Sequence, residues 1–181
     1  MSKKINKEDI YINLDMINQW INNSDNKTAI VLGLIGIFLT IIFTNGYFVN
    51  NIFKIITKMI SNINFSDILY LLFLISLIYI CLYGLWSLIK VLVPTLKMNT
   101  KTTKSYLYFG SISNYSSFKE YKNDLIEASS DDIIDDLLNQ VYQNSIICNK
   151  KYINFAKGIK CFLIGFVGTL IMYVIGVLIY L

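Results

Sequence analysis

The fold is decided by residues 28–49, TAIVLGLIGIFLTIIFTNGYFV, a stretch that carries no charged side chain. A helix needs about 20 apolar residues to cross a bilayer, so this stretch is long enough to span a membrane. Two similar blocks follow at residues 68–93 and 159–181. Each has its single charge near one end, at Lys90 or Lys160, where a long side chain reaches the interface. The sequence therefore predicts an all-α membrane protein with about three transmembrane helices.

The composition narrows the possible functions. The chain is 55% hydrophobic, and what lies outside the apolar blocks is too little for a large water-soluble core. It has no His and no Arg, so the usual general base and the usual bidentate phosphate clamp are missing. No nucleophile–base pair, metal motif or phosphate loop is present, and we expect neither an enzyme nor a metal site. The net charge of +4 comes without a Lys-rich run, which favours a membrane protein over a nucleic-acid binder.

The lysines between the blocks predict an orientation. Residues 1–27 hold four, the connection at residues 50–67 holds two, and the segment from Thr95 to Lys160 holds nine. Because cytoplasmic loops carry an excess of Lys, we expect the N-terminus inside and the C-terminus outside an inner membrane. Residues 1–27 then form a cytoplasmic amphipathic helix, 50–67 a short external amphipathic connection, and 95–158 a helical cytoplasmic sensor region between the second and third spans.

Two apolar stripes at helical spacing flank the membrane blocks. Ile10, Leu14, Ile17 and Ile21 form the first, and the second runs from Ile134 to Phe155. No Pro separates the second stripe from the last block, so we expect one helix of about 50 residues, about 75 Å long. The first stripe needs a partner surface and the second offers one. We therefore predict that the protein self-associates through these helices.

The sensor region contains two predicted helix starts. Ser117 is followed by Glu120, and Ser129 is followed by Asp132, each at the spacing of a capping box. We expect one helix to begin at each box, and the second to be the long helix that enters the membrane.

Three clusters near the membrane entries are candidates for binding. Asp25 and Lys27 form either a helix N-cap with a positive-inside anchor or a charge pair at a ligand site. Tyr108 and Phe109, beside a Gly, suit a flat stacked ligand, although hydrophobic anchoring of the segment is the commoner use. The stretch NKKY contains Lys151, which taken alone is an ordinary juxtamembrane charge.

In the order of these parts the sequence resembles the transmembrane effectors of Pycsar, the pyrimidine cyclase system for antiphage resistance. An N-terminal helix leads to a D-x-K motif at residues 25–27, and a second membrane helix follows. A Tyr-Phe-Gly element at residues 108–110 and an aromatic helix entry at residues 118–121 come next. A helix that reads NQVYQNSIICNKKYINFAKGIKCF then enters the last span. The likeness extends from about Ile10 to the end of the chain.

The resemblance implies a bacterial abortive-infection effector. In such systems a partner cyclase makes cyclic UMP or cyclic CMP during phage infection, and the effector senses it, associates and impairs the inner membrane. The cyclic nucleotide is then an activating ligand, with no other cofactor and no nucleic-acid partner expected. Without Arg, the phosphate contact would fall to Lys and backbone N–H groups.

We predict the ligand site at the cytoplasmic mouth of the membrane, where the three clusters flank the membrane entries. Lys can meet a cyclic phosphate as a point charge, and a pyrimidine can stack on an aromatic ring. Gln140 lies one turn before Asn144, one of the predicted site residues on the last helix. The predicted site consists of Asp25, Lys27, Tyr108, Phe109, Asn144 and Lys151.

Two other functions remain open from the sequence. One is a pore-former of the CBASS/SLATT type that is gated by another nucleotide signal. The other is a holin-like membrane toxin or an adaptor with no ligand. Gene context discriminates among them, because a neighbouring pyrimidine cyclase, a cGAS-like synthase or a phage lysis cassette would each favour a different function.

Overall fold

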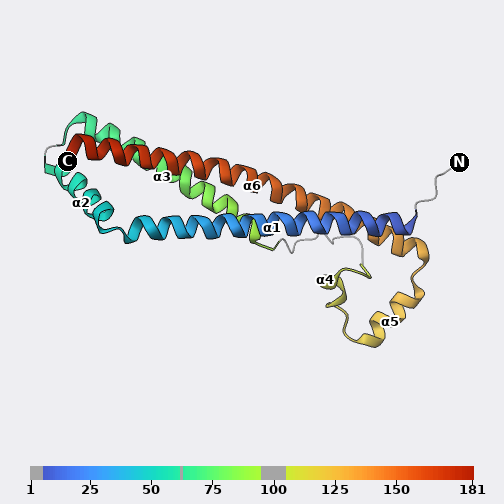
Figure 1. Ribbon diagram of the computed structural model, residues 1–181. Coiled ribbons are helices and arrows are strands. Elements are labelled where there is room, and N and C mark those ends of the chain that lie inside the picture. Colours follow the sequence, from blue (N-terminus) through green and yellow to red (C-terminus); the bar gives the residue numbers. More distant parts are fainter. Residues whose placement is uncertain (1–5, 62, 95–104) are drawn as a thin grey trace. The chain divides into compact units, whose positions relative to one another are not determined.

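A computed structural model describes residues 6–61, 63–94 and 105–181. All regular secondary structure in these ranges is helical, as the sequence predicts. Figure 1 shows the six helices, which are α1 (Lys7–Thr44), α2 (Gly46–Ser61), α3 (Phe65–Leu92), α4 (Phe109–Ile112), α5 (Phe118–Glu127) and α6 (Ser130–Tyr180).

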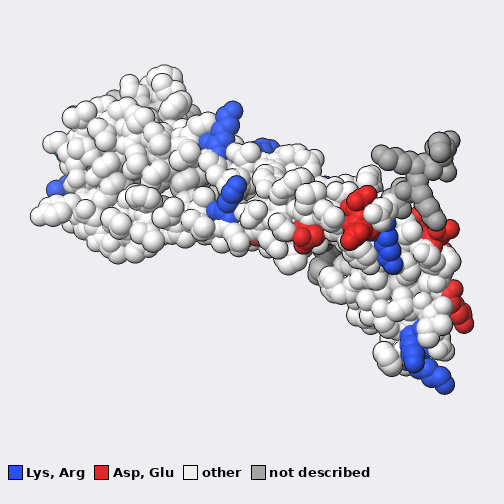
Figure 2. Space-filling model, turned by 45° about the vertical axis from the view of Figure 1, so that its right-hand side comes forward, with Lys and Arg blue, Asp and Glu red and all other residues white. Residues whose placement is uncertain are grey.

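The chain folds as two compact units. Unit 1 comprises Met1–Ser24 and Pro94–Lys151, and unit 2 comprises Asp25–Val93 and Tyr152–Leu181. Of the described helices, α1, α3 and α6 are long and apolar enough to cross a membrane. Figure 2 shows a broad surface over unit 2 without charged side chains, which is the kind of surface that lipid tails require. The chain is a membrane protein.

The first membrane helix ends before the apolar block does. α1 stops at Thr44, and the Asn45 side chain accepts hydrogen bonds from the backbone N–H groups of Tyr47 at 3.0 Å and Phe48 at 3.4 Å. Asn is a favoured N-cap because its side chain satisfies N–H groups that have no partner inside the helix. The last residues of the block, 46–49, therefore belong to α2.

In unit 2, α3 and α6 run antiparallel with their backbones in direct contact. A Cβ atom on Gly84 of α3 would lie 2.8 Å from the Cα of Phe162, and a Cβ on Gly165 of α6 would lie 2.7 Å from the Cα of Cys81. The second pair lies three residues earlier in α3 and three residues later in α6 than the first pair, as expected for antiparallel helices. Glycine is needed at both crossings because any side chain would force the helices apart.

The α3–α6 contact is continued by polar groups near the start of α3. Tyr70 donates its hydroxyl to the backbone oxygen of Met172 at 2.7 Å, and the Tyr180 hydroxyl donates to the carboxylate of Asp67. Asp67 is buried and also accepts the backbone N–H of Asn64 at 3.0 Å, which caps α3. These bonds fix the C-terminal turn of α6 against the first turn of α3.

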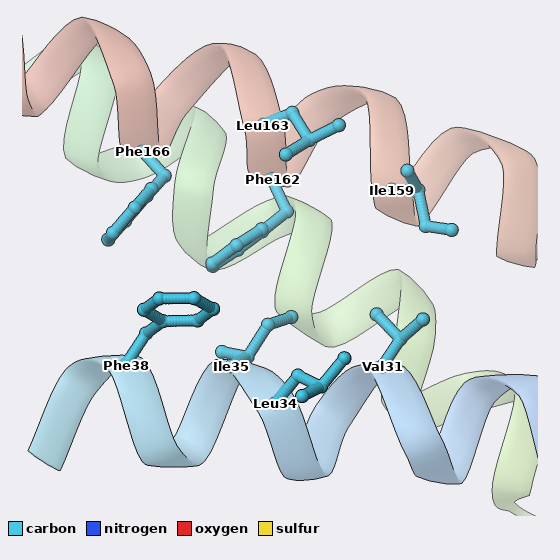
Figure 3. Close-up of a pocket in the computed structure, with 8 residues that line it drawn as sticks. All are labelled: Val31, Leu34, Ile35, Phe38, Ile159, Phe162, Leu163 and Phe166. Atoms are coloured by element: carbon cyan, nitrogen blue, oxygen red, sulfur yellow. The ribbon is translucent and has the colours of Figure 1, made fainter.

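The membrane part of α1 packs less closely. Ile35 meets Leu88 and Phe162 in a small apolar core, whereas added Cβ atoms on Gly33 and Gly36 would meet nothing within 4 Å. Figure 3 shows an apolar groove of about 320 Å³ that residues of α1 and α6 line from opposite sides. The lining residues are Val31, Leu34, Ile35, Phe38, Ile159, Phe162, Leu163 and Phe166.

In unit 1 parts of the two predicted apolar stripes are buried within the same chain. Ile10 and Ile17 of α1 are buried, as is Leu137 of α6, which is 1% exposed. The Asn144 side chain of α6 donates to Oδ1 of Asn18 of α1 at 2.9 Å. The first stripe therefore has an intramolecular partner, and self-association does not follow from its need for one.

Both predicted capping positions are found at helix starts, and one of them forms a complete capping box. Ser129 Oγ accepts the N–H of Asp132 at 3.1 Å, and the Asp132 carboxylate accepts the Ser129 N–H at 2.9 Å, so this box is complete. The Ser129 hydroxyl also donates to the Asp132 carboxylate at 2.6 Å, and this bond, with the backbone one to the carboxylate, lowers the pKa of Asp132 because it stabilises the charged form. At the start of α5, Ser117 Oγ accepts the N–H of Glu120, whose carboxylate turns to Ser116 instead. α6 is a single helix of 51 residues, which confirms the predicted continuous helix.

Candidate ligand site

The segment before α4 is organised by one carboxylate of α6. Asp136 Oδ2 accepts three hydrogen bonds, from Ser105 Oγ at 2.9 Å, from Tyr106 N–H at 2.8 Å and from Leu107 N–H at 3.1 Å. Ser105 Oγ in turn accepts the N–H of Tyr108 at 3.0 Å. Asp136 and Ser105 are both buried. Because bonds to a charged acceptor are roughly twice as strong as neutral ones, this arrangement fixes the backbone of the segment on α6.

Aromatic side chains connect α5 to the same segment. The Tyr121 hydroxyl donates to the backbone oxygen of Tyr106 at 3.2 Å. The ring of Tyr115 meets the ring of Tyr121 edge-on, with 5.3 Å between their centroids. The segment is therefore held by α6 on one side and α5 on the other, which leaves its remaining aromatic residues in defined positions.

The two predicted stacking residues differ in what they offer a ligand. The Tyr108 ring lies against Gly110, where an added Cβ would come within 2.5 Å of it, and its centroid is 4.7 Å from that of Phe109. Tyr108 is half-buried, whereas Phe109 is 65% exposed. Phe109 thus presents an open ring face for stacking, and the ring of Tyr108 lies beside it.

Four polar residues of α6 form what we call the polar row: Asp136, Gln140, Asn144 and Lys151. Their spacing places them within a narrow arc of one helix face, beside the buried apolar stripe. Asp136 binds the segment of residues 105–107, and Asn144 binds Asn18 of α1. Lys151 is also buried, with 8% of its surface exposed. Every residue of the polar row is therefore buried or half-buried.

Gln140 is distinctive within the row. Its Nε2 atom is buried, and within the described part of the chain it has no hydrogen-bond partner. A buried amide without a partner costs about 1–3 kcal/mol, so such groups are rare unless something else binds them. Gln140 lies one turn from Asp136 and one turn from Asn144, between the two attachment points of the row.

The other two predicted residues belong to unit 2. Asp25 is half-buried and Lys27 is exposed, and both lie within α1, next to the fully buried Thr28. α1 begins at Lys7, so the N-cap interpretation of Asp25 is wrong. The helix continues through this position because the apolar stripe before it and the apolar block after it have compatible helical periods.

Sequence reasoning did not find Asp136 and did not commit to Gln140. The pattern IIDDLL places Asp136 directly before the stripe residue Leu137, and a carboxylate at the edge of an apolar stripe was the available signal. Its partners lie about 30 residues earlier in the chain and could not be paired with it from the sequence.

Comparison with known proteins identifies the family. The profile of the Pycsar effector protein domain (PycTM) matches residues 9–180. The chain belongs to the Pycsar effector family. It is 32% identical over 167 residues to the Pycsar effector protein GmPycTM of Gulbenkiania mobilis, and the match covers 85% of this chain and 84% of the relative. No solved structure matches the chain.

Membership of the Pycsar effector family agrees with the observed architecture. The matched range includes the three candidate membrane helices, the segment of residues 105–110 and the polar row. The family consists of effectors, and the chain is accordingly a transmembrane effector of antiphage defence.

Proposed function

We propose that this effector responds to a cyclic pyrimidine mononucleotide, cyclic UMP or cyclic CMP, and then self-associates and disrupts the inner membrane. The cyclic nucleotide would be the second messenger of a pyrimidine cyclase that acts beside it. The observation that carries the proposal is the buried Nε2 atom of Gln140, which has no partner in the described chain and lies in the polar row of α6, the helix that also binds the segment of residues 105–107.

The chemistry of the row suits such a ligand. A pyrimidine edge presents carbonyl oxygens and ring or exocyclic nitrogens, and a side-chain amide both donates and accepts hydrogen bonds. Gln140 and Asn144 supply amides, and Phe109 supplies a ring face. A cyclic phosphate carries one negative charge, which Lys27 or Lys151 can meet without an Arg.

Self-association is supported by the membrane part of α1. Its exposed apolar side chains include Ile37 and Ile41, and the open positions at Gly33 and Gly36 would let another helix approach closely. Lipid provides no hydrophobic driving force for association, so membrane helices associate by close packing, which small residues on their surfaces permit.

The orientation proposed for the chain has its N-terminus in the cytoplasm. Single cysteines introduced at exposed positions of α2 and α5 can be labelled from either side of the inner membrane in a variant that lacks the native cysteines. We expect labelling from outside at α2 and from inside at α5. The opposite pattern would contradict the orientation.

The functional test uses the purified full chain in lipid vesicles that contain a fluorescent dye. Cyclic UMP, cyclic CMP, cyclic AMP, cyclic GMP and a cyclic oligonucleotide are added separately, and calorimetry, cross-linking and dye release are measured together. The proposal expects binding, larger cross-linked species and release with a pyrimidine nucleotide only. Release with a cyclic oligonucleotide would favour the CBASS/SLATT type, and release without any nucleotide would favour a holin-like toxin.

A further inference from the structure

α2 has two apolar faces, and the protein covers only one of them. On the covered face, Ile55 and Met59 are buried, and the ring of Phe48 contacts the tilted ring of Tyr173 of α6 with 4.3 Å between centroids. Asn51 on the same side donates to the Tyr173 hydroxyl at 3.4 Å. α2 is therefore fixed to unit 2 along this face.

The second apolar face points away from the chain. Phe53, Ile56 and Ile60 recur at i, i+3 and i+7, and they are 65%, 44% and 67% exposed. Contact of a continuous apolar face with water is unfavourable, so something apolar covers this face of α2.

A basic face lies next to the exposed apolar one. Lys54 and Lys58, one turn apart, are the only charged residues in the sequence of α2, and both are exposed. Together with Phe53, Thr57 and Leu181 they line a hollow of about 460 Å³. The hollow thus combines two ammonium groups, a hydroxyl and an aromatic ring.

The acidic groups of unit 2 do not complement these lysines. Its sequence contains two side-chain carboxylates, Asp25 and Asp67. Asp67 is buried, with one oxygen engaged by the Asn64 N–H and the other by the Tyr180 hydroxyl. Asp25 lies in α1, outside the hollow. A second copy of unit 2 would therefore bring little negative charge to Lys54 and Lys58.

We propose that α2 lies on the bilayer surface and that Lys54 and Lys58 bind the phosphate of an anionic phospholipid headgroup, while Phe53, Ile56 and Ile60 enter the acyl region. A helix with an apolar face beside a Lys-bearing face is the arrangement that interfacial helices use. A headgroup phosphate supplies the missing negative charge, and the adjoining tails cover the exposed face.

The test measures lipid binding by the detergent-solubilised full chain, without any nucleotide. Short-chain phosphatidylglycerol or phosphatidylcholine is titrated, and native mass spectrometry counts the bound lipids. We expect saturable, preferential binding of phosphatidylglycerol. Each Lys near an anionic surface strengthens binding by about fivefold, so Lys54→Gln/Lys58→Gln should weaken it by roughly 25-fold.

The matched control is Lys119→Gln/Lys122→Gln, which removes the same charge from two exposed residues of α5. It should keep the parent's affinity for phosphatidylglycerol. Equal binding of the two lipids by the parent would overturn the proposal, and so would an unchanged affinity of the α2 variant. Loss of a lipid-free cross-linked dimer in the α2 variant alone would assign the face to a second copy and overturn it equally.

Discussion

The contact of α3 with α6 depends on two glycines, and replacing both is a direct test of it. Gly84→Ala/Gly165→Ala adds one methyl group to each side of the crossing. The new carbon atoms would lie 2.8 Å from Phe162 Cα and 2.7 Å from Cys81 Cα, whereas carbon atoms pack at about 3.5–4.0 Å. The helices must separate by roughly 1 Å, which loosens their packing on both sides of the crossing.

The expected size of the effect follows from two opposing contributions. Overpacking costs about 1–3 kcal/mol at each site. Replacing Gly by Ala inside a helix contributes about 1 kcal/mol of stability per site. The double variant should therefore be destabilised by about 2 kcal/mol.

The matched control is Gly33→Ala/Gly36→Ala in α1. Added Cβ atoms there meet nothing within 4 Å, so only the helix contribution remains, and stability should rise by about 2 kcal/mol. The assay is chemical unfolding of both variants in the same detergent, followed by circular dichroism. If the α3–α6 variant unfolds at the same or a higher denaturant concentration than the α1 variant, the described packing of α3 on α6 is wrong.

Three further predictions concern the polar row, the membrane entry and the start of α6. Gln140→Leu removes a buried N–H without a partner, so the free energy of unfolding should rise by about 1–3 kcal/mol in thermal unfolding. Calorimetry should show lost affinity for cyclic UMP or cyclic CMP. Unchanged stability together with unchanged affinity would contradict this. Lys27→Glu should weaken nucleotide binding about 30-fold, because an attraction of about 1 kcal/mol at 4 Å in water becomes a repulsion of equal size, whereas Lys119→Glu should leave affinity unchanged in the same titration. The bonds from Ser129 lower the pKa of Asp132 below the ordinary 3.8, so their stabilising effect is present above that pH and lost as pH falls through the lower folded value. The difference in melting temperature between parent and Ser129→Ala should therefore be larger at pH 6 than under strong acid, where only the cap bond to the Asp132 N–H remains to distinguish them.

The number and type of the membrane helices could be predicted because uncharged blocks of this length have few other stable forms. The continuous α6 could be predicted too, since neither Pro nor a turn signal interrupts it. The break after Thr44 was missed although Asn45 and Gly46 form a turn signal, because both residues lie within an uncharged block.

The candidate site was less predictable because its contacts join distant parts of the chain. Phe109 and Asn144 could be selected by residue type and position, but the bonds from Asp136 to residues 105–107 depend on how a connecting segment returns to α6. The sequence also could not distinguish a half-buried Tyr108, in contact with Gly110, from an exposed Phe109 beside it. Local patterns carry no information on which neighbour covers a ring.

The backbone contact between α3 and α6 limits where a leak through the membrane can form. At the crossings of Gly84 and Gly165 an added carbon atom would overlap backbone atoms of the facing helix, so the two backbones touch and leave no gap for a water molecule. Ions and water therefore cannot permeate along the line where these two helices meet. A conducting path must follow the outer sides of the pair, where α1, lipid or another copy of the chain forms the facing wall.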